Sequence, residues 1–184
     1  MDATLRARLD AVFSSDRAAQ NQAYTALLDA TGQPVDWAYE VWDELLAGLR
    51  HPDNHVRAIS AQLLANLSWS DPLQRMLKDF PALLNVTRDE RFVTARHTMQ
   101  SIWKVGAAGP AQQQMLVNGL AARFAECAAE KNCTLIRYDI LECLWKLHEE
   151  VKDDAIRQTA LALIETEPDL KYRKKYAHIW KPRA

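Results

Sequence analysis

Apolar residues recur at intervals of three and four positions along nearly the whole chain, which is the period of an α-helix. The repeat is clear from Leu5 to Phe13, and it returns after each short polar, glycine or proline break. Only five glycines and seven prolines interrupt the chain, so the elements are long. The pattern predicts about ten helices, near 5–13, 16–31, 36–50, 53–67, 70–84, 88–103, 110–127, 136–148, 153–165 and 169–180.

Several of these stretches begin with a side chain that suits a helix N-cap. We expect Asp36 and Asp53 to open helices, and Ser70-Asp71-Pro72 to start another with proline in its first turn. Pro81 is predicted to kink or shorten that helix. Because the breaks are short, successive helices should lie antiparallel, and each pair must stack on the next to bury its apolar side. The sequence therefore predicts an all-α fold of about five antiparallel helix pairs.

A three-residue pattern recurs in the second half of the chain. Ile102-Trp103-Lys104, Leu144-Trp145-Lys146 and Ile179-Trp180-Lys181 each close a predicted helix. The copies are 42 and 35 residues apart, a spacing typical of repeats built from two helices. The recurrence indicates an array of similar helical units.

The segment Asp53-Asn54-His55-Val56-Arg57-Ala58-Ile59-Ser60-Ala61 resembles the second helix of a HEAT repeat, with an Asp, a Val-Arg pair and then small and apolar residues. Asp153-Asp154-Ala155-Ile156-Arg157-Gln158-Thr159-Ala160 is similar, and Ile136-Arg137 is a weaker copy. After Asp89 the chain departs from the pattern, because the arginine comes later, as Arg96. The resemblance implies a right-handed α-α superhelix over 36–180, about four helix pairs. The chain would then be one domain, 1–184, with a further pair at 1–35 and a tail at 181–184.

Composition and charge narrow the class of protein. The net charge is −1, which gives no strong attraction to DNA, although it divides into −4 through Phe92 and +3 from Val93 onward. No apolar run is long enough to cross a membrane, and the first residues lack the apolar run of a secretory signal. Three cysteines without metal-ligand spacing suit a reducing compartment. We therefore expect a cytoplasmic protein with no cofactor, no metal and no membrane contact.

Arginines near the starts of successive predicted helices are the first candidate binding groups. They are Arg57, Arg96, Arg137 and Arg157. One interpretation is a ladder of ion pairs between neighbouring repeats, with acids such as Asp53, Asp89 and Asp154, because a guanidinium suits a carboxylate. The other is a cationic strip on the concave surface, joined by Lys104, that holds phosphates or acidic peptides.

Aromatic residues are the second candidates. Trp103, Trp145 and Trp180 each follow a large apolar residue directly, so the two neighbours must point in different directions. They either pack between repeats or form an aromatic row that stacks on nucleobases or anchors a partner helix.

The last predicted helix carries both features. Lys171, Arg173, Lys174, Lys175, Lys181 and Arg183 follow Asp169 with no acid among them. The spacing predicts an apolar side formed by Tyr172, Tyr176, Ile179 and Trp180. The basic side is either the solvated face of a capping helix or a contact, through Arg173 and Lys174, with an acidic partner or nucleic acid.

Catalytic signatures such as GxSxG, HExxH or a glycine-rich phosphate loop are absent from the sequence. Some HEAT-like proteins are DNA glycosylases with aromatic rings and an aspartate on a basic concave surface. Asp139, with Trp103, Arg137 and Trp145, would take those roles here, but no motif of that family matches these positions. The simpler interpretation of Asp139 is a solvated helical aspartate or a partner for a nearby lysine. The sequence thus predicts a non-enzymatic scaffold or adaptor that binds a protein or peptide. A nucleic-acid-binding protein or repair glycosylase is the alternative, and a structural piece of a larger assembly is a third.

Overall fold

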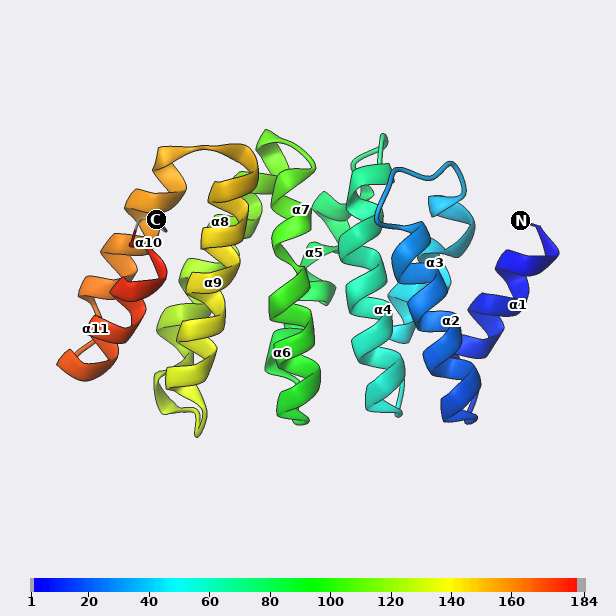
Figure 1. Cartoon of the computed structure of the whole chain (residues 1–184), viewed down its shortest axis with the longest axis horizontal. Helices are drawn as coiled ribbons and strands as arrows, with labels where there is room; N and C mark the ends of the chain where they lie inside the picture. Colours follow the sequence, from blue (N-terminus) through cyan, green and yellow to red (C-terminus); the bar gives the residue numbers. More distant parts are fainter. Residues whose placement is uncertain (1, 182–184) are drawn as a thin grey trace.

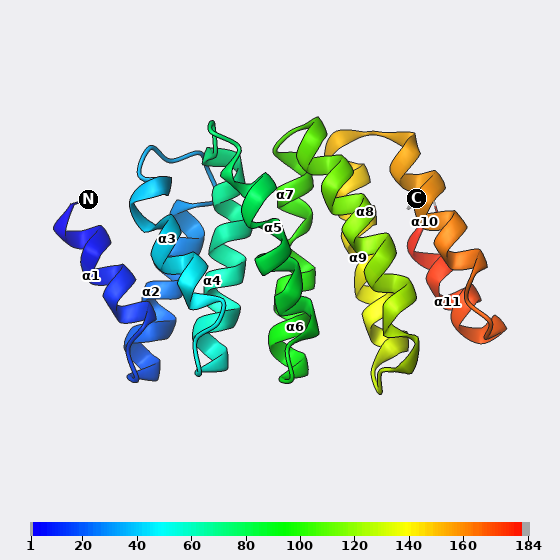
Figure 2. The ribbon, with the colours of Figure 1, turned by 180° about the vertical axis from the view of Figure 1, so that it is seen from behind.

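The computed structural model describes residues 2–181, and in this range the chain is all-α, with no β-strand. The helices form two layers (Figure 1). The front layer, nearer the viewer in Figure 1, contains α2 (Arg17–Ala30), α4 (Asn54–Leu67), α6 (Phe92–Ser101), α7 (Trp103–Ala107), α9 (Cys133–Val151) and α11 (Leu170–Ile179). The back layer, nearer the viewer in Figure 2, contains α1 (Ala3–Val12), α3 (Ala38–Gly48), α5 (Arg75–Asn85), α8 (Pro110–Glu126) and α10 (Asp154–Glu165). Short 3-10 helices follow α4, α5 and α8, at Ser68–Ser70, Val86–Arg88 and Cys127–Ala129.

Along the chain the helices follow one another in five pairs: α1 with α2, α3 with α4, α5 with α6, α8 with α9, and α10 with α11. The third pair is joined through the 3-10 helix Val86–Arg88, and α7, which follows α6, packs against α8. The pairs lie side by side from one end of the molecule to the other (Figure 1). Each front helix contacts the next front helix, and from α3 onward the back helices do the same. The front-layer helices α2, α4, α6, α9 and α11 begin at the same edge of the molecule, so their first turns lie in one row, whereas α7 follows α6 toward the opposite edge.

Aspartates cap five of the α-helices within the described residues. The caps are Asp2, Asp16, Asp53, Asp153 and Asp169, and each carboxylate accepts a backbone N–H from the first turn of its helix. Asp36 is an exception, because α3 begins only at Ala38 and its N-cap, Trp37, makes no side-chain cap bond. The expected start there is wrong by two residues.

The turn before α5 also differs from the expectation. Asp71 does not stand directly before the helix; α5 begins at Arg75, after Gln74 in a left-handed conformation at φ 55°. The Asp71 carboxylate still reaches the N–H groups of Arg75 and Met76, at 2.9 and 2.8 Å. Pro81 does not end the helix, since α5 continues to Asn85.

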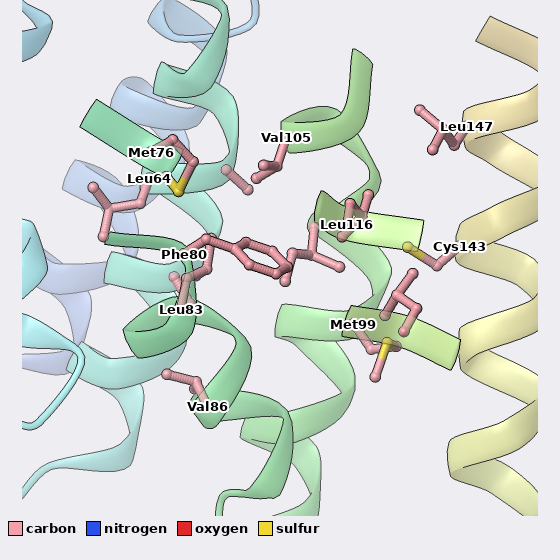
Figure 3. Packing of buried hydrophobic residues seen from close by; sticks show 14 of the residues in the cluster. Leu64, Met76, Phe80, Leu83, Val86, Met99, Val105, Leu116, Cys143 and Leu147 are labelled. Carbon is pink, nitrogen blue, oxygen red and sulfur yellow. The ribbon is translucent and has the colours of Figure 1, made fainter. Parts of the chain in front are cut away.

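Side chains from both layers fill a continuous apolar core. Figure 3 shows its centre, where Phe80 of α5 points between Leu64 of α4 and Leu116 of α8. Toward α9, Val105 and Leu116 are followed by Cys143 and Leu147. Because each pair buries its apolar side against both neighbours, the core extends along the row. No helix within residues 2–181 combines the length and apolarity needed to span a membrane.

Candidate functional site

Ion pairs join every pair of helices to the next along the edge where the front helices begin. In each case an arginine from the first turns of a front helix reaches a carboxylate of the following pair. The closest oxygens lie 2.5 to 2.8 Å from the guanidinium nitrogens. The four ion pairs, called here the arginine ladder, are Arg17–Asp53, Arg57–Asp89, Arg96–Asp139 and Arg137–Glu167.

The arginine ladder has well-defined geometry. Arg57 and Arg96 each bind their carboxylate with two parallel hydrogen bonds. The hydrogen bond from Arg17 lowers the pKa of Asp53. Burial alone would raise the pKa of Asp89, but the hydrogen bonds from Arg57 and from a backbone N–H outweigh it and lower that pKa. These arginines are thus engaged inside the protein, which favours the ladder over the cationic strip.

The carboxylates in the arginine ladder are only partly those that the sequence predicts. Asp53 and Asp89 take part, but Asp139 and Glu167 occupy the remaining positions, and Arg17 is a member that the sequence pattern missed. Arg157 is exposed on α10 and forms no ion pair with a residue in the range 2–181.

Asp139 differs from the exposed, solvated aspartate of the simpler interpretation. Its side chain is 2% exposed, and both oxygens accept hydrogen bonds from Arg96, at 2.7 and 3.0 Å. A carboxylate that activates a nucleophile must reach its substrate within hydrogen-bond distance. This arrangement gives Asp139 a structural role and does not favour a glycosylase role.

Trp103 and Lys104 are the first two residues of α7, which packs against α4 in the front layer. The Lys104 ammonium is 2.5 Å from the Asn66 side-chain oxygen and 5.9 Å from the centre of the Trp103 ring. Burial, and then the charge of Lys146, lower the pKa of Lys104. Trp69 donates its indole N–H to the Lys104 carbonyl and packs edge-on against Trp103. Both predicted binding residues therefore help to join neighbouring pairs.

The other two tryptophans of the recurring triplets lie near the C-terminal end. Trp145 is half-buried on α9, while Trp180 is buried and lies 5.7 Å from the His148 ring, between ring centres. Trp145, His148 and Trp180 line a groove of about 560 Å³, and Arg157 lines it too. In each triplet the aliphatic residue is buried. In the first two the tryptophan lies at the margin of the core, which agrees with the expectation that neighbours point in different directions.

A groove with a volume of about 1090 Å³ lies between α9 and α11. Four lysines line it: Lys171, Lys174, Lys175 and Lys181. Opposite them, α9 contributes Tyr138 and Glu142, and the Lys175 ammonium lies 4.9 Å from the centre of the Tyr138 ring. We call this the lysine groove. It brings together basic, aromatic and apolar groups at one place on the front layer.

Of the two predicted binding residues on α11, only one lines the lysine groove. Lys174 is exposed there. Arg173 instead turns toward its own helix pair, where it donates to the Glu167 carbonyl at 2.7 Å and pairs with Glu165. Arg183, from the predicted basic run, and most of the predicted tail lie outside the described residues.

The α9 side of the lysine groove was not among the residues that the sequence predicts. Tyr138 and Glu142 are four residues apart, so they share one side of α9. That spacing was visible in the sequence, but nothing in it shows which side of α9 borders α11.

Two cysteines approach each other at the turn between α8 and α9. The sulfur atoms of Cys127 and Cys133 are 2.8 Å apart, and both are free thiols. Burial, together with the hydrogen bond between the two thiols, raises the pKa of Cys127 to about 12. Within residues 2–181, no group of three histidine, cysteine or acidic side chains is arranged to hold a metal ion.

No protein-family model matches this sequence, and no curated protein matches it.

Proposed function

We propose that the chain is a non-enzymatic binding module, a right-handed superhelix of HEAT type that binds a protein or peptide on its front layer. The recurring triplets and the HEAT-like Asp–Val–Arg segments support the repeat architecture. The arginine ladder supports it too, because the same contact recurs at each junction between helix pairs. In this proposal the front layer forms the concave surface.

The lysine groove is the observation that carries the binding function. Arg57, Arg96 and Arg137 hold internal carboxylates, and Lys104 holds Asn66, so these four predicted binding groups have partners already. By contrast, Lys171, Lys174 and Lys181 have no ion-pair partner within the described residues. Cations that gather in a groove without carboxylate partners are suited to a ligand from outside.

A selection from a random peptide library displayed on phage tests this function. We expect peptides that bind the chain and slow amide hydrogen exchange in α9 and α11. They should bind poorly to the double variant Lys171→Glu, Lys174→Glu. Enrichment no greater on the natural chain than on this variant, or protection confined to the back layer, would refute the proposal.

The repair-enzyme alternative has its own test. Because the Asp139 carboxylate is occupied by Arg96, we expect no release of an alkylated base from duplex DNA. Release that disappears in Asp139→Asn, with the helical circular dichroism unchanged, would establish the enzyme instead.

A further inference from the structure

The lysines of α11 form a row along one side of the helix. Lys171, Lys174, Lys175 and His178 follow one another at intervals of three, one and three residues, which places them on a common face. Lys171 and His178 are about 10 Å apart along the helix axis. Lys181, just beyond the helix, extends the row. A ligand that contacts all of them must therefore be elongated and lie alongside α11.

The charges in the lysine groove are unbalanced. Four ammonium groups line it, against a single carboxylate, Glu142. Lys175 is held over the Tyr138 ring, which is an attractive contact but does not neutralise its charge. Like charges at this spacing repel one another, and a ligand with several carboxylates or phosphates would relieve the repulsion. The groove therefore favours an anionic ligand.

The groove also has an apolar part. Leu170, the first residue of α11, is 65% exposed and lines the groove together with Tyr138. An exposed leucine alone is ordinary. Here it lies at one end of the row of lysines and offers an apolar contact that a simple anion or a sugar-phosphate chain would not use.

Two features favour a peptide over a nucleic acid. First, the arginines at the starts of α2, α4, α6 and α9 are paired with carboxylates, so the basic surface of the groove does not continue along that edge of the front layer. A duplex, with its dense row of phosphates, is bound by a longer basic surface. Second, Glu142 repels phosphates but accepts a hydrogen bond from a peptide N–H.

We propose that the lysine groove binds an acidic, extended segment of a partner protein. Its carboxylates pair with Lys171, Lys174 and Lys181, and one of its apolar side chains covers Leu170. An extended chain advances about 3.3 Å per residue, so a segment of roughly five residues spans the row. This inference rests on the proposed function and specifies the chemistry of the partner.

A labelled peptide of alternating glutamate and leucine is the probe, and its fluorescence anisotropy reports binding. We expect Lys171→Glu with Lys174→Glu to weaken binding by about tenfold or more, since two attractive contacts become repulsive. The matched control is Lys78→Glu with Lys131→Glu, which makes the same change in net charge at exposed sites outside the groove. It should weaken binding by less than about twofold, because screening limits distant charges.

Two further changes separate the acidic and apolar contributions. Replacing the glutamates of the probe by glutamine should abolish most of its binding, and Leu170→Ser should weaken the original probe several-fold. Equal weakening by both double variants, or no effect of Leu170→Ser, would overturn the inference. Duplex DNA that displaces the probe at lower concentration than unlabelled peptide would also overturn it, in favour of nucleic acid.

The two proposals fail in distinguishable ways. If the phage selection yields peptides that are not acidic, yet bind the natural chain better than the double variant and protect α9 and α11, the acidic-segment inference is wrong and the binding module stands. If the selection yields nothing, and the glutamate–leucine probe does not bind, both are wrong.

Discussion

The carboxylate of Asp139 on α9 accepts two hydrogen bonds from the guanidinium of Arg96 on α6, at 2.7 and 3.0 Å. The two residues are 43 positions apart in the chain and belong to neighbouring helix pairs. Because Asp139 is almost fully buried, Arg96 is what makes the charge of this carboxylate tolerable in the core. The junction between the third and fourth pairs therefore depends on this contact.

Removing the guanidinium should destabilise the protein. We expect Arg96→Ala to lower the free energy of unfolding by about 2–4 kcal/mol, because it leaves a buried carboxylate without its charged partner. Urea denaturation followed by circular dichroism measures this. Arg91→Ala, which removes an exposed arginine from the same region, should change stability by less than about 0.5 kcal/mol. Equal losses in the two variants would contradict the role assigned to the ion pair.

Replacing both partners provides a second check on the same junction. Arg96→Met with Asp139→Leu removes the charge and its counter-charge together, so the double variant should recover most of the stability lost in Arg96→Ala. A double variant as unstable as the single one would show that packing, and not the unpaired charge, sets the cost.

Gly48 marks a close approach between α3 and α4. A Cβ atom at this position would lie 2.2 Å from the Ser60 hydroxyl oxygen and 3.1 Å from the Ser60 Cβ. Alanine is a better helix former than glycine by about 1 kcal/mol. We nevertheless expect Gly48→Ala to be destabilising, by about 1–3 kcal/mol, because the helices must separate.

The Ser60 hydroxyl offers a control for that prediction. It is buried and has no hydrogen-bond partner within the described residues. Ser60→Ala should therefore be neutral or slightly stabilising, and it should reduce the cost of Gly48→Ala, because the nearest clashing atom is gone. Thermal melting of the two single variants and the double variant tests this. Strictly additive effects would argue against a direct clash.

Stability should decrease at acid pH. The pKa of Asp53, lowered by Arg17, and that of Glu44, lowered by Arg6, lie below their values in the unfolded chain. Such groups stabilise the fold above the unfolded pKa values, about 3.9 and 4.3, and this contribution is lost as the pH falls through the folded values. We expect the urea midpoint to be nearly constant from about pH 7 to 5 and to fall below about pH 4.

The variant Arg17→Gln should flatten part of this acid response. It removes the hydrogen bond that lowers the pKa of Asp53, so its stability curve should lie below that of the natural chain at neutral pH and approach it at low pH. Parallel curves across the whole range would exclude a contribution of this ion pair to the acid sensitivity.

Cys127 should resist alkylation in the folded protein. With a pKa of about 12, its thiolate is scarce at pH 8, and its sulfur is buried. Cys143 is buried too, and burial raises its pKa. Brief treatment with iodoacetamide should therefore modify at most Cys133 in the native state and all three cysteines in urea, as mass spectrometry would show. Rapid native modification of Cys127 would contradict the described packing.

The helices were largely predictable because their signals are local. The apolar period, the capping aspartates such as Asp53 and Asp153, and the break after Gly109 each depend on residues within a turn or two. The expectation at Asp36 was wrong because an aspartate before an apolar run suits an N-cap, yet α3 begins at Ala38 with Trp37 as its N-cap and no side-chain cap bond. The left-handed Gln74 gave no signal, because non-glycine residues rarely adopt that conformation.

The candidate site was only partly predictable, because its contacts join residues that are far apart in the chain. Arginine near a helix start suggested an ion pair, but the partner of Arg137 is Glu167, which is 30 positions away in the chain and was not among the predicted acids. Likewise, the lysines of α11 were visible as a charged run, whereas Tyr138 came to face them only through the packing of α11 on α9.

The arginine ladder has a mechanical consequence. Each arginine of the ladder pairs with a carboxylate of the next helix pair only, so each junction between helix pairs has its own ion pair. When its two ends are pulled apart, such a molecule should separate at one junction at a time, and the separation of one junction should leave the others intact.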